Sequence, residues 1–379
     1  MKICQSVSSI SRLGAGVSGF LLPLSLKLNN AAVDIKVISL VDKYSASDSI
    51  LWEPLKPVLL NCLIKKIGYS SDFITGLNQI NASLLHQHGL WLYPSLATLI
   101  WTTKHKIPRI VSPHGMLEPW AWNHNKWKKL PIWFLWEKKN MTTASAIHVT
   151  SEQEMFAVRS LGIKTPIAII PIGIDILKTD NQSNTYKRST KKTILFLSRI
   201  HPKKGIENLI NAWQKIKYDD WIVIIAGPSD RKYLDELISL RNKLHLEDHI
   251  IFKDAVYEDE KWQLLMDSDI FVLPSYSENF GIVIAEALAS GTPVITTKST
   301  PWKGLIDNKC GWWIDIGVDP LTDALFAAMN LTDEQRHLMG QQGRQYMQRE
   351  FNWQESTFKM KALYEWAINN NQKPDFVYL

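Results

Sequence analysis

The chain has 379 residues, which is long for a single hydrophobic core and predicts two domains. Its content of 45% hydrophobic and 21% charged residues is typical of a soluble globular protein and argues against a disordered or fibrous one. The three cysteines, Cys4, Cys62 and Cys310, lie far apart, which argues against a zinc site or a disulfide framework and fits a reducing cytoplasm. The net charge of +6 favours anionic partners.

The apolar segment at residues 19–26 is similar to the core of a secretory signal. It begins late, is broken by Pro23 and lacks a convincing cleavage site, so we expect it to be folded. No apolar run reaches a membrane-spanning length free of charge. The sequence therefore predicts a protein that is neither exported nor integral to a membrane.

The first half of the chain alternates predicted strands with predicted helices. Apolar runs predict strands at residues 3–7, 33–41, 84–88, 110–112, 146–150 and 167–170. A helix follows the first strand as far as about residue 29, and another spans 152–161. This alternation predicts a parallel sheet with helices on both faces.

A glycine-rich segment, Gly14-Ala-Gly16-Val-Ser-Gly19, lies between the first strand and this helix. Its spacing fits the dinucleotide-binding fingerprint, and Asp42 closes the second strand where a ribose-binding acid is expected. Six residues, however, separate the first strand from Gly14, whereas the glycines of a nicotinamide site follow the strand directly. A nicotinamide-dependent oxidoreductase is therefore the less favoured interpretation.

His86 and His88 lie on the same face of a predicted strand, where two imidazoles can bind a metal ion. No third ligand lies at a suitable spacing. We therefore expect a structural or cleft-lining pair and no metal site.

Residues 119–139 combine aromatic and basic side chains in an unusual density. Five tryptophans alternate with five lysines: Trp120, Trp122, Trp127, Trp133 and Trp136, and Lys126, Lys128, Lys129, Lys138 and Lys139. Aromatic rings at headgroup depth with lysines toward anionic lipid are typical of an interfacial segment. Tryptophans in the core with lysines in solvent are the alternative, and the sequence fits both. A nucleic-acid surface fits less well, because no nucleic-acid-binding motif accompanies these residues.

A polar segment at residues 176–191 predicts a linker, after which a second set of strands and helices begins. Strands are expected at 193–197, 221–226, 250–252, 270–273 and 293–296, and helices at 205–217, 230–244, 257–266 and 280–289. A tail helix at 354–369 follows the second sheet and is expected to cross back onto the first. Two α/β halves predict a cleft between them, where ligands of such sheets bind.

The chemistry of the second half is concentrated between Pro274 and Gly291. A buried strand stops at Pro274, a polar turn follows, and a helix then runs to the cap residue Gly291. The free N–H groups at the start of such a helix suit a phosphate. Two carboxylates accompany it, and Glu286, among alanines and aliphatic residues, needs a capping or basic partner.

Two cations stand at an earlier strand-to-helix turn of the same sheet. Arg199 follows a strand directly, and Lys204 precedes the next helix. Together they can bind a diphosphate. The guanidinium of Arg199 can donate two parallel hydrogen bonds, and the ammonium of Lys204 supplies a compact positive charge. The alternative is ordinary solvated surface charge.

These motifs resemble those of the family-4 retaining glycosyltransferases of the GT-B fold. The resemblance rests on Ser198-Arg199 with Lys204-Gly205, on Glu278-Asn-Phe-Gly281 and on the spacing Glu278-x7-Glu286. Further segments are similar to the family's acceptor-side loop and interdomain turn, namely Ser112-Pro-His114-Gly-Met-Leu-Glu-Pro-Trp120 and Pro171-Ile-Gly173-Ile-Asp175. Residues 297–305 depart from the family, whose Gly-Gly and glutamate are absent here.

The resemblance implies a role for each matching residue. Arg199 and Lys204 would neutralise the leaving diphosphate, Glu278 would face the donor sugar, and His114 would lie beside the transferred sugar. Glu286 would accept hydrogen bonds from the ribose hydroxyls.

The backbone of the motifs has implied roles as well. The amides of Asn279, Phe280 and Gly281 would lie near sugar and phosphate. Gly14 belongs to the first glycine-rich loop, where Gly16 would let the backbone approach the diphosphate.

The fold implied is GT-B, with two Rossmann-like domains facing a cleft. The first would comprise residues 1–175 with the tail 354–379 packed back on it, and the second, which binds the donor, residues 192–353. The implied activity is metal-independent, retaining transfer of a hexose from a nucleotide-diphosphate sugar to a hydroxyl of a growing surface polysaccharide, such as capsule or lipopolysaccharide. The acceptor would be a sugar linked to polyprenyl diphosphate or a lipopolysaccharide. The enzyme would be cytoplasmic and peripheral to a bacterial inner membrane, whose surface it would contact through residues 119–139. A nucleotide-sugar epimerase of the same fold and a non-catalytic sugar-binding protein remain alternatives.

Overall fold

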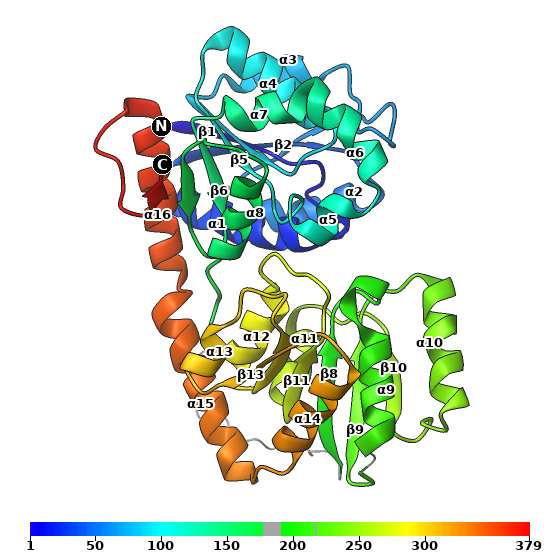
Figure 1. The fold of residues 1–379 in the computed structure, drawn as a ribbon. Coiled ribbons are helices and arrows are strands. Elements are labelled where there is room, and N and C mark those ends of the chain that lie inside the picture. The colour runs from blue at the N-terminus through cyan, green and yellow to red at the C-terminus, as the bar shows by residue number, and fades with distance from the viewer. Residues whose placement is uncertain (177–190, 217) are drawn as a thin grey trace. The chain divides into compact units, whose positions relative to one another are not determined.

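The computed structural model describes residues 1–176, 191–216 and 218–379, and it divides into two compact units. The first unit comprises Met1–Gly173 together with Trp353–Leu379, and the second comprises Ile174–Asn352 (Figure 1). Most of the expected linker at 176–191 lies outside the described residues.

The first unit is built on an eight-stranded sheet. Its strands are β1 (Lys2–Ser6), β2 (Asp34–Leu40), β3 (Val58–Leu60), β4 (Leu84–His88), β5 (Arg109–Ser112), β6 (Ala146–Val149), β7 (Ile167–Ile169) and β14 (Val377–Tyr378). Their order in the sheet is β14-β7-β6-β5-β4-β1-β2-β3, and all are parallel except β14, which pairs antiparallel with β7. Parallel strands bring their carboxyl ends to one edge of the sheet, where His88 of β4 pairs with Ser112 of β5.

Helices cover both faces of this sheet. They are α1 (Ala15–Asn30), α2 (Ser45–Asp48), α3 (Phe73–Ile80), α4 (Tyr93–His105), α5 (Pro119–Asn123), α6 (Lys126–Ile132), α7 (Lys138–Thr142) and α8 (Glu152–Ser160). Shorter helical turns are η1 (Arg12–Gly14), η2 (Ser49–Trp52) and the π-helical η3 (Trp133–Glu137). Helices α3, α4 and α7 lie on one side of the sheet, and α1 lies on the other (Figure 1). Val158 of α8 shares a hydrophobic core with Met141 of α7, on the side of the sheet opposite α1.

The apolar segment 19–26 forms the middle of α1, as expected for a folded segment. Phe20, Leu21 and Leu24 are buried, and Pro23 lies inside the helix. Among the described residues, no helix combines the length and the apolar character that crossing a membrane requires.

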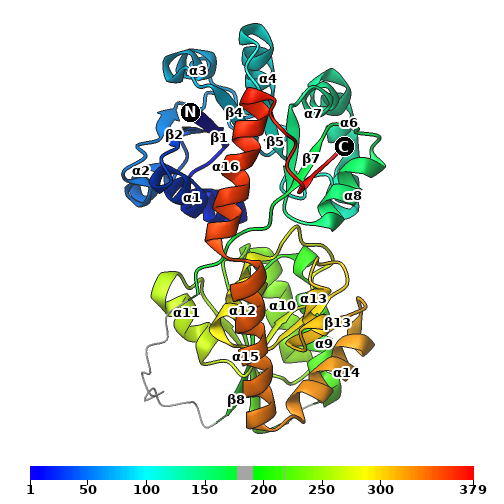
Figure 2. The ribbon, with the colours of Figure 1, turned by 90° about the vertical axis from the view of Figure 1, so that its left-hand side faces the viewer.

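The tail helix α16 (Trp353–Asn369) belongs to the first unit, where it packs against α1 and β4 (Figure 2). Tyr364 of this helix is fully buried and forms hydrogen bonds within the unit. The crossing of the C-terminal helix onto the first sheet is thereby confirmed.

The second unit contains a parallel six-stranded sheet. Its strands are β8 (Lys192–Leu197), β9 (Trp221–Ala226), β10 (Ile250–Lys253), β11 (Ile270–Leu273), β12 (Val294–Thr297) and β13 (Gly311–Ile314), in the order β10-β9-β8-β11-β12-β13. The helices are η4 (Pro202–Lys204), α9 (Ile206–Ile216), α10 (Arg231–Lys243), α11 (Glu258–Met266), α12 (Ile282–Ser290), α13 (Gly304–Asp307), α14 (Val318–Met329) and α15 (Asp333–Glu350). Helix α9 packs against α10 and α14, while α12 packs against α11 and α15.

Two Rossmann-like α/β sheets therefore confirm the predicted fold class. The edge strands β3, β13 and β14 and the helices α2–α7 and α13–α15 were not predicted from the sequence. The strand β13 begins with Gly311 and two half-buried tryptophans, so neither a long apolar run nor a clear alternation marks it.

Candidate functional site

The start of α12 is shaped by Gly281, which has a positive φ of 76° and precedes the first helical residue, Ile282. The helix thus begins two residues later than predicted, because residue 281 adopts the left-handed conformation that glycine favours. The other end is capped by Gly291, again left-handed with φ of 82°.

Glu278 lies in the turn before α12 and is almost completely buried. Its carboxylate forms an ion pair with Lys204 and accepts a hydrogen bond of 2.8 Å from Ser275 Oγ. Burial alone would raise the pKa of Glu278, but the charge of Lys204 and these hydrogen bonds outweigh it, and the pKa lies below its ordinary value. The carboxylate is therefore ionised at neutral pH and held in one place.

Lys204 reaches Glu278 because two strand-to-helix turns of the sheet lie against each other. The amide of Tyr276 donates to the carbonyl of Lys203 over 2.8 Å. At Gly205, with φ of 68°, a Cβ atom would lie only 2.2 Å from the carbonyl oxygen of Pro274. Glycine is required there, because any side chain would push the two turns apart.

Arg199 lies two residues beyond β8, as predicted, and its side chain is exposed. Within the part of the chain that the structure describes, it forms no ion pair. The structure thus brings Lys204 and Glu278 into contact and leaves Arg199 directed to solvent.

Glu286 finds its partner in Lys261 of α11, whose Nζ lies 2.6 Å from the carboxylate. The basic residue is thus a lysine of the preceding helix, a long-range pairing that local pattern does not reveal. Burial raises the pKa of Glu286, and the charge of Lys261 offsets only part of this effect.

The segment 297–302, which departs from the family pattern, supports the turn that carries Glu278. Trp302 Nε1 donates to the carbonyl of Phe280 over 2.5 Å, and the amide of Glu278 donates to the carbonyl of Ser299 over 3.3 Å. The rings of Phe280 and Trp302 pack with a centroid distance of 5.2 Å. The side chain of Phe280 is thus a packing element, and only its backbone is available to a ligand. Asn279 is partly exposed beside it.

His114 lies in the turn that follows β5 and has a positive φ of 51°, which is uncommon for a residue with a side chain. Glu154, which no sequence motif singled out, accepts a hydrogen bond of 2.6 Å from the amide of Gly115 and so holds this turn. His114 Nε2 lies 2.9 Å from His88 Nδ1. Burial lowers the pKa of His114 to about 3, so the ring is neutral at pH 7.

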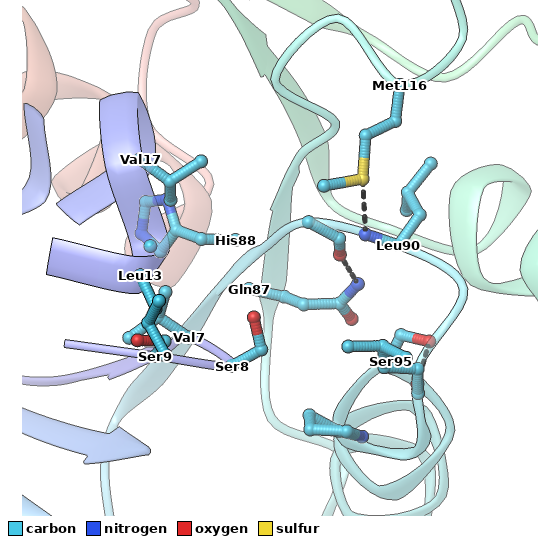
Figure 3. Close-up of a pocket in the computed structure, with 14 residues that line it drawn as sticks. Val7, Ser8, Ser9, Leu13, Val17, Gln87, His88, Leu90, Ser95 and Met116 are labelled. Atoms are coloured by element: carbon cyan, nitrogen blue, oxygen red, sulfur yellow. Dashed lines mark hydrogen bonds between the residues drawn. The ribbon is translucent and has the colours of Figure 1, made fainter. Parts of the chain in front are cut away.

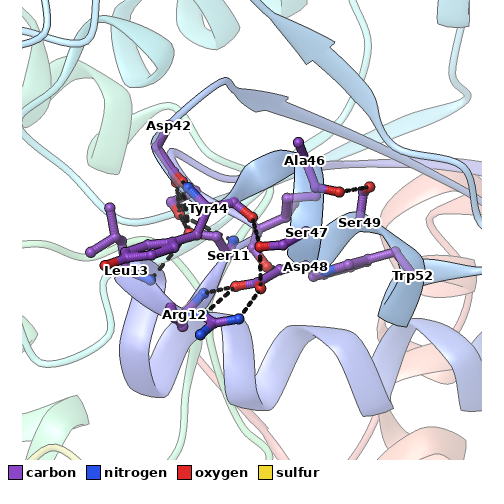
Figure 4. A network of polar contacts seen from close by, with 12 residues as sticks. Ser11, Arg12, Leu13, Asp42, Tyr44, Ala46, Ser47, Asp48, Ser49 and Trp52 are labelled. Carbon is purple, nitrogen blue, oxygen red and sulfur yellow. Dashed lines mark hydrogen bonds and ion pairs between the residues drawn. The ribbon is translucent and has the colours of Figure 1, made fainter. Parts of the chain in front are cut away.

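The glycine-rich loop is tied to the segment after β2 (Figure 4). Asp42 accepts hydrogen bonds from Ser9 Oγ (2.5 Å) and Ser11 Oγ (2.8 Å), and Asp48 pairs with Arg12. Asp42 is thus used to hold the loop, which argues against the ribose-binding role that a nicotinamide site would assign to it.

Within this loop the two glycines differ. A Cβ atom on Gly14 would lie 1.8 Å from Ser18 Oγ, so no larger residue fits there. Gly16 is exposed in the first turn of α1, and a Cβ atom added to it would have no neighbour within 4 Å. The space beside Gly16 is therefore open to a ligand.

A cavity of about 230 Å³ opens between this loop and the end of β4 (Figure 3). Ser9, Gly14, His88 and Met116 are among its lining residues. Ser95 lines it as well and donates over 2.5 Å to Glu137, a fully buried carboxylate. The cavity is part polar and part apolar, which suits a ligand with hydroxyl groups on a hydrocarbon frame.

The tryptophan- and lysine-rich segment 119–139 divides between core and surface. Trp122 and Trp133 pack with Trp91, with ring centroids 5.2–6.3 Å apart. Trp127 of α6 is 71% exposed, and Phe134 and Leu135 of η3 are 72% and 74% exposed. The segment therefore combines the two interpretations offered by the sequence, with some tryptophans in the core and other apolar side chains exposed.

The two halves of the chain match two protein-family models. Residues 16–177 match Glycosyltransferase Family 4, and residues 178–346 match Glycosyl transferases group 1.

Among curated proteins, the alpha-monoglucosyldiacylglycerol synthase of Streptococcus pneumoniae is 27% identical over 225 residues, which cover 56% of this chain and 50% of the relative. The phosphatidyl-myo-inositol mannosyltransferase of Mycobacterium leprae is 26% identical over 244 residues, covering 63% of this chain and 62% of the relative. The matched part spans about half the length of the first of these and somewhat more of the second.

Among solved structures, Anabaena Alr3699/HepE in complex with UDP and glucose superposes with a TM-score of 0.80 at 16% identity, covering 96% of this chain and 99% of that one. WaaG, a glycosyltransferase involved in lipopolysaccharide biosynthesis, superposes with a TM-score of 0.72 at 14% identity, covering 98% and 100% of the two chains. At these identities the likeness shows a shared fold.

Proposed function

We propose, from the premise that this chain belongs to the glycosyltransferases of the GT-B fold, that it transfers a hexose from a nucleotide-diphosphate sugar to a hydroxyl group with retention of configuration. The acceptor proposed is a growing surface polysaccharide linked to a lipid. The observation that carries the proposal is the pair of turns in the second unit, where Lys204 and Glu278 meet before the N-terminus of α12.

The chemistry of the leaving group explains why positively charged side chains are needed at this site. When the bond between the sugar carbon and the phosphate oxygen breaks, negative charge develops on the diphosphate. Lys204, Arg199 and the amides at the start of α12 would stabilise that charge, a task that metal ions perform in other transferases. A bound diphosphate would compete with Glu278 for Lys204 and leave the carboxylate to accept hydrogen bonds from sugar hydroxyls.

Glu286 is proposed to accept hydrogen bonds from the ribose hydroxyls. Its burial and its partner Lys261 keep the carboxylate in a defined position. The amides of Asn279 and Gly281 would contact sugar and phosphate.

The first unit is proposed to supply the acceptor side. The cavity beside Gly14 and His88 has polar and apolar walls suited to a compound that carries sugar hydroxyls. The acceptor oxygen would bond to the sugar carbon on the face that the phosphate leaves, and its proton would pass to the departing phosphate oxygen. This route involves no covalent glutamyl intermediate.

A lipid surface is the partner proposed for α6 and η3. Trp127, Phe134 and Leu135 are exposed, and Lys126 and Lys138 are exposed beside them in the sequence. The names of the two curated relatives above contain diacylglycerol and phosphatidyl-myo-inositol, which supports a lipid-linked acceptor.

A screen of nucleotide-sugars by thermal shift, followed by assay of released nucleotide diphosphate with and without membrane lipid extract, tests the proposal. A nucleotide-sugar should raise the melting temperature, and the extract should stimulate diphosphate release. Lys204→Ala and Glu286→Ala should each weaken nucleotide-diphosphate binding by at least about tenfold. Lys215→Ala removes an exposed lysine of the same unit and serves as the matched control.

The outcomes separate the alternatives. Donor consumption without an acceptor requirement would indicate an epimerase, and sugar binding without diphosphate release would indicate a non-catalytic protein. If no nucleotide or nucleotide-sugar stabilises the protein, the proposal fails.

A further inference from the structure

Four histidines of the first unit form a cluster at the carboxyl ends of β4, β5 and β6. His86, His88 and His148 are buried, and His114 packs beside them. Ring centroids lie 4.2 Å apart for His86 and His88 and 5.2 Å apart for His88 and His114. The family resemblance gives a role only to His114, so the other three rings need a separate explanation.

A continuous chain of hydrogen bonds links these rings. At one end His148 Nε2 lies 3.1 Å from the carbonyl oxygen of Ile170, and His148 Nδ1 lies 2.7 Å from Ser112 Oγ. Ser112 Oγ is also 2.7 Å from His86 Nε2, and His86 Nδ1 is 2.8 Å from the hydroxyl of Tyr364.

The chain continues from Tyr364 to His114. Gln5 Nε2 lies 2.8 Å from the Tyr364 hydroxyl, and Gln5 Oε1 lies 2.7 Å from His88 Nε2. His88 Nδ1 is in turn 2.9 Å from His114 Nε2. Within the residues that the structure describes, Nδ1 of His114 has no hydrogen-bond partner.

The carbonyl of Ile170 decides the direction of the first half of the chain. A carbonyl oxygen only accepts, so His148 must carry its proton on Nε2. A neutral ring then has a bare Nδ1, and Ser112 must donate its only hydroxyl proton to it. The oxygen of Ser112 is left to accept from His86, which places the proton of His86 on Nε2.

The same reasoning decides the second half. His86 Nδ1 is bare, so Tyr364 donates its hydroxyl proton there and accepts from the amide of Gln5. Gln5 Oε1 must then accept from Nε2–H of His88, which leaves Nδ1 of His88 bare. His114 therefore donates to it through Nε2–H, and its own Nδ1 carries a lone pair.

This argument requires each imidazole ring to be neutral, with a proton on only one nitrogen. Burial keeps the rings neutral because it disfavours the charged form. Burial lowers the pKa of His148 to about 4 and that of His114 to about 3, and it lowers the pKa of His86 and His88 well below the ordinary value. Burial also raises the pKa of Tyr364, so its hydroxyl keeps the proton that it donates.

We propose that this chain holds all four histidines as Nε2–H tautomers and presents Nδ1 of His114 as a fixed hydrogen-bond acceptor for a hydroxyl of the substrate. Gln5, Ser112 and Tyr364 are then positioning residues, and Tyr364 lies on the C-terminal helix. The assignment of a substrate hydroxyl as the partner of His114 rests on the proposed function. The assignment of the four tautomers does not depend on it.

Nitrogen-15 NMR of the full chain with labelled histidine tests the tautomers directly. At pH 7 the four rings should each show a protonated Nε2 and an unprotonated Nδ1, with assignments from single histidine-to-glutamine variants. An Nδ1–H tautomer or a charged ring at any of the four positions overturns the inference.

The variant Tyr364→Phe tests the direction of the chain, with Tyr378→Phe as the matched control in the same unit. Without the hydroxyl, Gln5 loses the acceptor that orients its amide, so His88 and His114 should populate both tautomers. His86 and His148 should stay Nε2–H, because Ile170 and Ser112 still orient them. Unchanged tautomers at His88 and His114 would overturn the role of Tyr364.

Kinetics separate this inference from the proposed function. Tyr364→Phe should lower kcat by about tenfold, the loss expected for one directed hydrogen bond, with a smaller change in the donor KM. An inactive protein with four Nε2–H rings would contradict the proposed function alone. An active protein in which His114 is Nδ1–H would contradict the inference alone.

Discussion

The ion pair formed by Lys204 and Glu278 contributes to stability and also lies at the proposed binding site. Their side chains are only 12% and 11% exposed, so each charge depends on the other for its partner. A ligand anion that attracts Lys204 would have to leave Glu278 with other hydrogen-bond donors, such as Ser275. The same pair therefore links the stability of the free protein to ligand binding.

Removal of one member of this pair should destabilise the second unit. Lys204→Met should lower the free energy of unfolding by about 3 kcal/mol, because Glu278 would be left buried without a counter-charge. The double variant Lys204→Met with Glu278→Gln should recover most of that loss, since it removes both charges. Denaturant unfolding measures both effects.

An exposed pair provides the control for this prediction. Lys215→Met breaks the pair that Lys215 forms with Asp319, in which the two side chains are 51% and 81% exposed, and should cost less than about 1 kcal/mol. Additive losses in the double variant would contradict the argument that the two charges compensate each other.

Gly16 and Gly19 allow a comparison of stability with binding. Both are exposed helical residues of α1 with nothing within 4 Å of an added Cβ atom. Each change to alanine should therefore raise the free energy of unfolding by about 0.5 kcal/mol. Only Gly16→Ala should also weaken nucleotide-sugar binding, measured by calorimetry, because the proposed diphosphate approaches that backbone. Equal binding by the two variants would remove Gly16 from the proposed site.

Among the helices and loops, each candidate site residue depends on a neighbouring segment to hold its turn. The loop after β12 supports the turn before α12 through Trp302, and α8 supports the turn of His114 through Glu154. The segment from α6 to η3 differs, because it buries Trp133 but exposes Phe134 and Leu135. Its inward side chains anchor it, and its outward ones are free to bind a surface.

Vesicle flotation tests that segment. Replacement of Trp127, Phe134 and Leu135 by serine should weaken binding to vesicles containing anionic lipid by at least about tenfold, because three large apolar side chains no longer enter the interface. High salt should weaken binding of the unsubstituted protein as well, since it screens the lysines.

A control with three exposed apolar residues outside this segment separates membrane binding from general hydrophobicity. Phe156, Phe326 and Phe358 are 63%, 53% and 68% exposed, and their replacement by serine should leave flotation unchanged. Equal losses in the two triple variants would argue against a specific lipid-binding segment.

Across the molecule as a whole, the two units differ in what they bury. The first unit encloses neutral histidines and the carboxylate Glu137, whereas the second encloses the ion pairs of Glu278 and Glu286. Buried groups whose pKa differs from that of the unfolded chain make stability depend on pH.

Stability should fall as the pH drops below about 6.5, where the unfolded chain protonates the histidines but the native state does not. His114 and His148, with pKa values of about 3 and about 4, each contribute a slope that rises toward about 1.4 kcal/mol per pH unit as the pH falls to about 5, and His86 and His88 add to it. Burial raises the pKa of Glu137 and Glu286, which therefore oppose part of the effect.

Denaturant unfolding between about pH 7 and pH 5 measures the slope, and calorimetry in buffers of different ionisation enthalpy counts the protons taken up on unfolding. A stability that is independent of pH across this range would contradict the burial of neutral histidines.

The amino-acid sequence was sufficient to predict the two α/β halves and most of their strands. Apolar runs such as 270–273 end at proline or glycine, and these local signals depend only on nearby residues. The candidate residues Arg199, Lys204, Glu278 and Glu286 were identified by type and spacing in the same way.

Only the tertiary structure shows which of these residues contact one another. It also shows which other residues hold their turns in place. Lys204 contacts Glu278 across 74 residues, Lys261 pairs with Glu286, and Glu154 holds the turn of His114. The second half of the histidine chain takes its direction through Tyr364, which lies 278 residues from His86. Such contacts form because folding buries polar groups, which must then be paired with partners far away in the sequence. The local pattern of residue types does not predict which partners these will be.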